Sequence, residues 1–168
     1  FKHYRQFDNY FFFPEADQGR LRYREDDLIN EKGDSVNVRA RLTLIGQKRE
    51  DHLEHDVLLS RSRFLAPATH SLRFYREYFK PAEEVVIEKD RLRWHISYKD
   101  TEFFLNLDEM TQPATGHYLE IKSRTWSRKD AERKAELTTE LMALLSVADN
   151  PTVAQDYIEL IRRRKTAA

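Results

Sequence analysis

The sequence contains no cysteine and only four glycines in 168 residues. Without cysteine the chain can form no disulfide, offers no thiol nucleophile and has no ligands for a cysteine-bound zinc or iron–sulfur site. So few glycines disfavour a phosphate cradle built from backbone N–H groups, and the P-loop, nucleophile-elbow and dinucleotide-binding motifs are all missing. A phosphate site would therefore have to be built from side chains.

Long apolar runs and an excess of charge of one sign are missing as well. No stretch approaches the roughly 18 uninterrupted apolar residues of a transmembrane helix, so we expect no membrane partner. The 29 basic side chains balance 29 acidic ones, and this neutrality argues against a general nucleic-acid binder but leaves room for a local basic site. The lack of cysteine fits a cytoplasmic protein.

What the chain does have is a strand-like pattern through its first three quarters, followed by a helical pattern. The predicted strands cover residues 20–24, 36–47, 55–64, 84–93, 94–99, 102–107 and 118–125. A short helix is expected before Pro81 and a loop over 113–116. Ser127 is the expected N-cap of a helix that stops at Asn150, and a second helix is predicted over about 152–164.

Many antiparallel strands followed by terminal helices predict an α+β fold. We expect one domain over residues 1–168, with mostly barrel strands over 1–126 and a helical tail over 127–168. The strands are predicted to form an antiparallel β-barrel, or tunnel, of about eight strands, with the C-terminal helices packed outside.

Charges recur at every second residue of the predicted strands and so share one face of each strand. These residues include Arg20, Arg22, Arg24, Arg39, Arg41, Lys89, Arg91, Arg93, Lys122 and Arg124. One interpretation is a sheet whose polar side faces water. The other is that helices cover the apolar faces, so that the cations line a closed sheet and need a polyanion such as a short polyphosphate as counter-charge. Asp108 and Glu120 in the same lining would then hold a hard divalent cation.

Several segments resemble motifs of CYTH domains, the triphosphate tunnel metalloenzymes. The segment GHYLEIKSRTWSRKDAE (116–132) resembles the last strand and following helix of that family. The segments QFDNYF (6–11), LRYR (21–24), RLTLIG (41–46), KDR (89–91) and LNLD (105–108) resemble earlier family strands in the same order. Together they cover nearly the whole chain.

This resemblance implies a tunnel that binds and hydrolyses a small triphosphate with Mg²⁺ or Mn²⁺. The triphosphate could be inorganic, thiamine or nucleoside triphosphate. The implied phosphate-binding residues are Arg22, Arg24, Arg39, Arg41, Lys89, Arg91 and Lys122, with Lys89 as a catalytic residue and Glu120 and Asp108 as metal ligands. Catalysis would consist of positioning and electrostatic stabilisation of an in-line attack.

The chain departs from the family at two places. The family's opening E-x-E-x-K strand is missing, and we expect it upstream of Phe1, in a longer protein that can also carry a fused upstream domain. The last strand reads Glu120-Ile-Lys122 where the family has E-x-E. This lysine favours an alternative function, a catalytically weak regulatory domain that binds polyphosphate or a nucleotide. A nucleic-acid-binding barrel is a third, weaker hypothesis, which the even charge balance disfavours.

Overall fold

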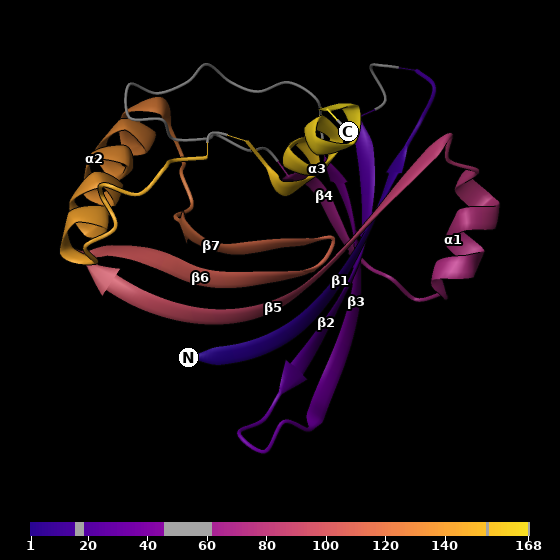
Figure 1. Ribbon diagram of the computed structural model, residues 1–168, viewed down its shortest axis with the longest axis horizontal. Helices are drawn as coiled ribbons and strands as arrows, with labels where there is room; N and C mark the ends of the chain where they lie inside the picture. The colour runs from indigo at the N-terminus through magenta and orange to yellow at the C-terminus, as the bar shows by residue number, and fades with distance from the viewer. Residues whose placement is uncertain (16–18, 46–61, 154, 168) are drawn as a thin grey trace. The chain divides into compact units, whose positions relative to one another are not determined.

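The computed structural model describes residues 1–15, 19–45, 62–153 and 155–167, and within this part it contains seven strands and three helices (Figure 1). The strands are β1 (Lys2–Phe12), β2 (Arg20–Ile29), β3 (Ser35–Ile45), β4 (Ser62–Pro67), β5 (Glu83–Tyr98), β6 (Thr101–Gln112) and β7 (Ala114–Lys122). The helices are α1 (Leu72–Phe79), α2 (Arg128–Leu144) and α3 (Tyr157–Ala167). The α+β class is confirmed. None of the described helices is both long and apolar enough to cross a membrane.

The strands form one sheet in the order β4-β3-β2-β1-β5-β6-β7. The pairs β1/β2, β1/β5, β2/β3 and β3/β4 are antiparallel. Within the described ranges β4 and β7 are the two edges and do not pair with each other, so the prediction of a closed barrel of about eight strands was wrong. A barrel closes only when its first and last strands are hydrogen-bonded to each other. The alternation of polar and apolar residues along one strand does not reveal whether such pairing exists.

Two compact units make up the chain. The first contains the described residues within 1–48, 61–94 and 106–119, and the second contains those within 95–105 and 120–168. The boundaries fall inside β5, β6 and β7. The organisation as a single domain stays a prediction.

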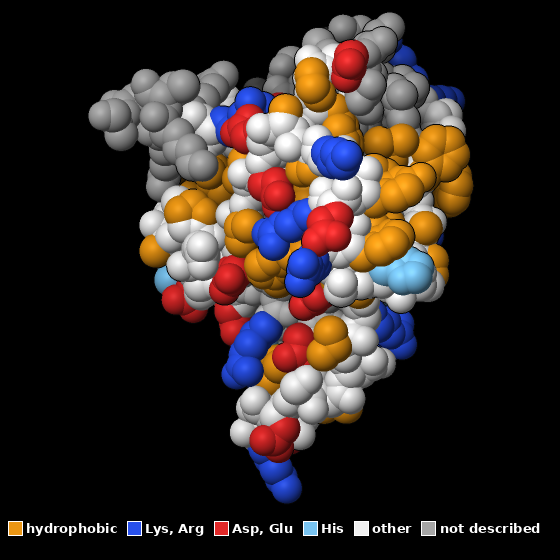
Figure 2. All heavy atoms as spheres, turned by 90° about the vertical axis from the view of Figure 1, so that its right-hand side faces the viewer, with side chains coloured by type: hydrophobic (Ala, Val, Ile, Leu, Met, Phe, Trp, Pro, Cys, Tyr) orange, Lys and Arg blue, Asp and Glu red, His pale blue; other side chains and the backbone are white. Residues whose placement is uncertain are grey.

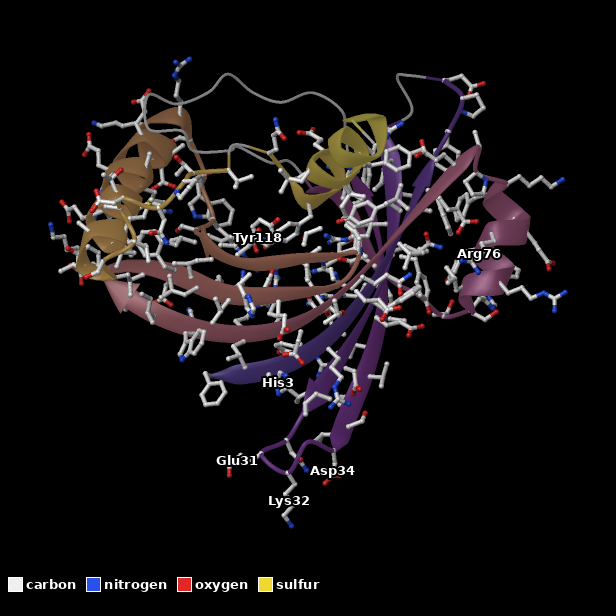
Figure 3. The ribbon with its side chains drawn as sticks, viewed as in Figure 1. His3, Glu31, Lys32, Asp34, Arg76 and Tyr118 are labelled. Atoms are coloured by element: carbon white, nitrogen blue, oxygen red, sulfur yellow. The ribbon has the colours of Figure 1, made fainter. Side chains whose placement is uncertain are left out.

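In the first unit, local sequence signals start and stop the elements. The side chain of Asn30 accepts hydrogen bonds from the backbone N–H groups of Lys32 and Asp34, which closes the turn between β2 and β3 (Figure 3). Ser71 caps α1 by accepting from the N–H of Phe74. The short helix expected before Pro81 is therefore confirmed.

The apolar side of β1, β2 and β3 packs against α1. Buried Phe11, Leu21 and Tyr23 from the strands contact Tyr75 from the helix. Around them lie Phe7, Phe13, Ala40, Leu42, Leu44, Ala68, Leu72 and Phe79, which are partly buried. In this unit the helix that covers the apolar strand face is thus the short α1 rather than a C-terminal helix.

In the second unit, β5 and β6 meet at a tight turn in which Lys99 and Asp100 both have positive φ angles, 47° and 57°, as expected for a two-residue hairpin loop. Leu137 and Leu141 of α2 are buried with Phe103 of β6. The partly buried Ile96, Tyr98 and Ile121 pack against the same group. A C-terminal helix therefore does cover apolar strand residues here, as predicted.

Two predicted boundaries differ from the structure, and two others fall partly outside the described residues. The loop expected over 113–116 is shorter in the structure, where a turn at Pro113 alone separates β6, which continues to Gln112, from β7, which starts at Ala114. Ser127 does cap α2, but the helix stops at Leu144 rather than near Asn150. The part of the predicted strand 55–64 that precedes residue 62, and the end of the strand 36–47, lie outside the described residues.

Candidate functional site

The sheet of the first unit carries its cations on one face. Residues directly opposite in neighbouring strands point to the same side, and the register pairs Arg24 with both Asp8 and Arg41, and Lys89 with Gln6. We call this side the cationic face. On β1, β2, β3, β5 and β6 it bears nine cations (Lys2, Arg20, Arg22, Arg24, Arg39, Arg41, Lys89, Arg91 and Arg93) and four carboxylates (Asp8, Asp26, Glu83 and Asp108).

The opposite face of the same strands has the reverse balance. It bears the cation Arg5 and six carboxylates, Glu25, Asp27, Glu84, Glu88, Asp90 and Glu109. Helix α1 lies on this side and adds basic residues such as Arg76, whose Nε donates to Glu84 at 2.7 Å. On the side of the molecule that carries α1, basic and acidic side chains are accordingly interspersed (Figure 2). A neutral chain thus separates its charges across one sheet.

The centre of the cationic face is a buried ion-pair cluster. Asp8 is 0 % exposed, and its two oxygens accept from Nε and Nη2 of Arg24 at 2.5 and 2.6 Å. The amine of Lys89 lies 3.6 Å from Asp8, and Nε of Arg22 lies 4.0 Å from it. Cations from the strands on both sides of β1 therefore converge on one carboxylate.

The same arrangement is repeated on β5 and β6. Asp108 is 0 % exposed and accepts from Nε of Arg91 at 2.5 Å and from its Nη2. The amine of Lys89 lies 3.9 Å from Asp108. Two residues further along β5, Nε of Arg93 donates to Asn106 at 2.8 Å. The amine of Lys89 therefore lies between two carboxylates, each of which accepts hydrogen bonds from Nε and Nη2 of an arginine.

The cluster shifts the proton affinities of its members. Burial raises the pKa of Asp8, but Arg24 and Lys89 outweigh burial and hold that pKa well below its usual value. Burial, with the charges of Arg24 and Arg91, lowers the pKa of Lys89 from 10.5 to about 7, against the attraction of Asp8 and Asp108. The carboxylate thus stays ionised at every working pH, whereas the lysine titrates near neutrality.

Towards β3 the cationic face is more open. Asp26 accepts hydrogen bonds from Gln6 and Arg41, and the side chain of Arg41 remains 38 % exposed. The Nε groups of Arg22 and Arg41 are buried and donate to no acceptor in the described part of the chain. A depression of about 320 Å³ opens beside Arg41, and exposed Arg39 also lines it. Two arginines of this face therefore each keep one buried N–H group that lacks an acceptor among the described residues.

The predicted site residues fall into two groups. Arg22, Arg24, Arg39, Arg41, Lys89, Arg91 and Asp108 share the cationic face of the first unit. Glu120 and Lys122 belong to the second unit, where their side chains pair with each other at 2.7 Å. The predicted phase of the charges is confirmed on β2, β3 and β5, while the roles assigned to individual residues stay predictions.

Among the described residues, the side chains form no site that fits Mg²⁺ or Mn²⁺. Such ions need several oxygen ligands, and no group of three acidic or histidine side chains able to hold a metal exists among the described residues. Both oxygens of Asp108 accept from Arg91, and Glu120 faces the amine of Lys122. In this structure the two predicted metal ligands hold cationic side chains instead.

Sequence reasoning missed the acids that organise the face. Asp8 lies two residues after Gln6, and Asp26 lies two residues after Arg24, so each acid shares a strand face with another polar residue. This alternation was the sequence signal that could have identified them. The contacts depend on which residues stand opposite each other in neighbouring strands, and that register cannot be obtained from a single strand.

No model of a known protein family matches the chain, and a search of curated proteins found no match either.

Proposed function

We propose that this chain binds a small oligophosphate, such as a triphosphate, on the cationic face. The observation that carries the proposal is the separation of charge, nine cations to four carboxylates on one side of the sheet and one to six on the other. The chain as a whole is neutral, so the excess is local. A local excess of cations is the expected footprint of an anionic ligand.

The chemistry of the arginine side chains supports phosphate as that anion. Arginine presents a planar fork that matches two phosphate oxygens, and charge-assisted hydrogen bonds of this kind are about twice as strong as neutral ones. Arg22 and Arg41 each have a buried Nε–H that donates to no described acceptor. Leaving a buried donor unsatisfied costs stability, and a phosphate oxygen would supply the missing acceptor.

Binding without turnover fits the geometry better than metal-dependent hydrolysis. The described residues form no divalent-metal site, and Asp108 is engaged by Arg91. We therefore favour the second function that the sequence leaves open, a polyphosphate-binding regulatory domain. Hydrolysis with Mg²⁺ or Mn²⁺, the family resemblance, a fused upstream domain and a cytoplasmic location stay predictions.

Calorimetric titration with tripolyphosphate in EDTA tests the proposal. Wild-type protein should bind, and Arg22→Gln and Arg41→Gln should each weaken binding about tenfold, the order expected for one charge-assisted contact. Arg73→Gln is the matched control, because this arginine lies on α1, is 86 % exposed and pairs with Glu77. No binding by the wild-type protein would contradict the proposal. Phosphate release in a parallel assay with Mg²⁺ or Mn²⁺ would make the domain an enzyme.

A further inference from the structure

We infer that Asp8 is a positioning residue of the cationic face, and that its carboxylate fixes the guanidinium plane of Arg24 for contact with the bound oligophosphate. The inference rests on the proposed function and names the group that orders its site. Asp8 itself does not touch the ligand, because its side chain is 1 % exposed, whereas the side chain of Arg24 keeps 9 % of its surface exposed and would meet the ligand through that part.

The place of Asp8 in the sheet supports this role. It lies on β1, the central strand in the order β4-β3-β2-β1-β5-β6-β7. Arg24 on β2 donates to both of its oxygens, and Lys89 on β5 approaches to 3.6 Å from the other side. One carboxylate thereby sets the positions of cations from two neighbouring strands.

The side-on geometry determines what Arg24 can offer a ligand. Its Nε and one N–H of Nη2 are directed at Asp8, so the orientation of the whole planar group is set before any ligand binds. A flexible arginine would lose rotamer freedom on binding, and that loss weakens affinity. The low pKa of Asp8 keeps the carboxylate charged, so the orientation is held at every working pH.

Asp8 also has an opposing effect, because its negative charge repels an anion. Substitutions that keep every charge separate positioning from repulsion. Asp8→Glu moves the carboxylate by one methylene, and Arg24→Lys replaces the planar fork by a point charge. If Asp8 acts through Arg24, the effects of the two substitutions on affinity cannot be additive.

The test is a double-mutant cycle on tripolyphosphate affinity, measured by calorimetry in EDTA. Asp8→Glu and Arg24→Lys should each raise the Kd about tenfold, and the double variant should be within about twofold of Arg24→Lys. Glu84→Asp is the control, because Glu84 pairs with Arg76 of α1 at 2.7 Å on the opposite face of the sheet (Figure 3). It should bind with wild-type affinity.

Two results would overturn the inference: wild-type affinity in Asp8→Glu, or effects that multiply in the double variant. Should thermal unfolding show that Asp8→Glu is not folded, the isosteric Asp8→Asn decides instead. Weaker binding by Asp8→Asn supports positioning even though the variant has one negative charge fewer, whereas equal or tighter binding contradicts it. Failure of the wild-type protein to bind tripolyphosphate would refute the proposed function itself.

Discussion

Replacing Lys89 by methionine should change how the stability of the fold depends on pH. The residue is 4 % exposed, and its amine lies 3.6 Å from Asp8 and 3.9 Å from Asp108. Burial, with Arg24 and Arg91, lowers its pKa from 10.5 to about 7 in spite of both carboxylates. In the unfolded chain the pKa returns to its usual value. Between pH 7 and 10.5 the unfolded state therefore holds one proton that the folded state lacks.

The sign follows from proton linkage. Where the unfolded state binds more protons, the free energy of unfolding rises with pH, so this stability is lost as the pH falls from 10.5 towards 7. One pKa unit corresponds to about 1.4 kcal/mol, and the lowered pKa of Lys89 is worth up to about 5 kcal/mol over the whole window. Between about pH 7.5 and 9.5 the rise should be about 2–3 kcal/mol. Below pH 7 both states are protonated and the lysine adds no slope.

Urea unfolding at about pH 7.5, 8.5 and 9.5 measures this difference. The contributions of other titrating groups cancel when the pH profile of the wild type is compared with that of Lys89→Met, because methionine binds no proton at this position. From about pH 7.5 to 9.5, the free energy of unfolding of the wild type should rise by about 2–3 kcal/mol more than that of the variant. Lys32→Met, in the exposed turn between β2 and β3, is the control and should keep the wild-type slope. Parallel profiles for wild type and Lys89→Met would refute the reasoning.

Three further predictions concern stability. Asp108→Asn removes the charged partner of Arg91, which is 1 % exposed, and should lower the free energy of unfolding in urea by about 3–5 kcal/mol. The control Glu109→Gln, at the exposed neighbouring residue, should change this free energy by less than about 0.5 kcal/mol. Phe11→Ala, at a core position that is 0 % exposed, should cost about 3–5 kcal/mol in the same assay. Ser127→Ala removes the N-cap of α2 and should cost about 1 kcal/mol, seen as a lower melting temperature by circular dichroism. For any of the three positions, a loss below about 0.3 kcal/mol would contradict the contact assigned to it.

The phase of the charges could be predicted from the sequence because a strand repeats every two residues. Arg22 and Arg24 alternate with Leu21 and Tyr23, and the structure places the first pair on the cationic face and the second pair in the core against α1. The cap at Ser127 was equally local, since a serine followed three residues later by an acid carries the signal within one turn.

What could not be predicted depends on relations between strands. Whether a sheet closes is decided by its edge strands, and nothing within β4 or β7 specifies a partner for the edge. The balance of buried charge depends on register, because Asp8 neutralises Arg24 only when the two stand opposite each other. For the same reason the sequence suggests Asp108 as a metal ligand, whereas in the fold its carboxylate accepts a hydrogen bond from Arg91.

The central claim, that an oligophosphate binds the cationic face, is tested most directly by an NMR titration that follows the arginine Nε–H signals. Tripolyphosphate should shift the signals of Arg22 and Arg41, whose buried Nε–H groups donate to no described acceptor. The signal of Arg5, on the opposite face of β1, should stay in place. Shifts of Arg5 without shifts of Arg22 and Arg41, or no shifts at millimolar tripolyphosphate, would contradict the account.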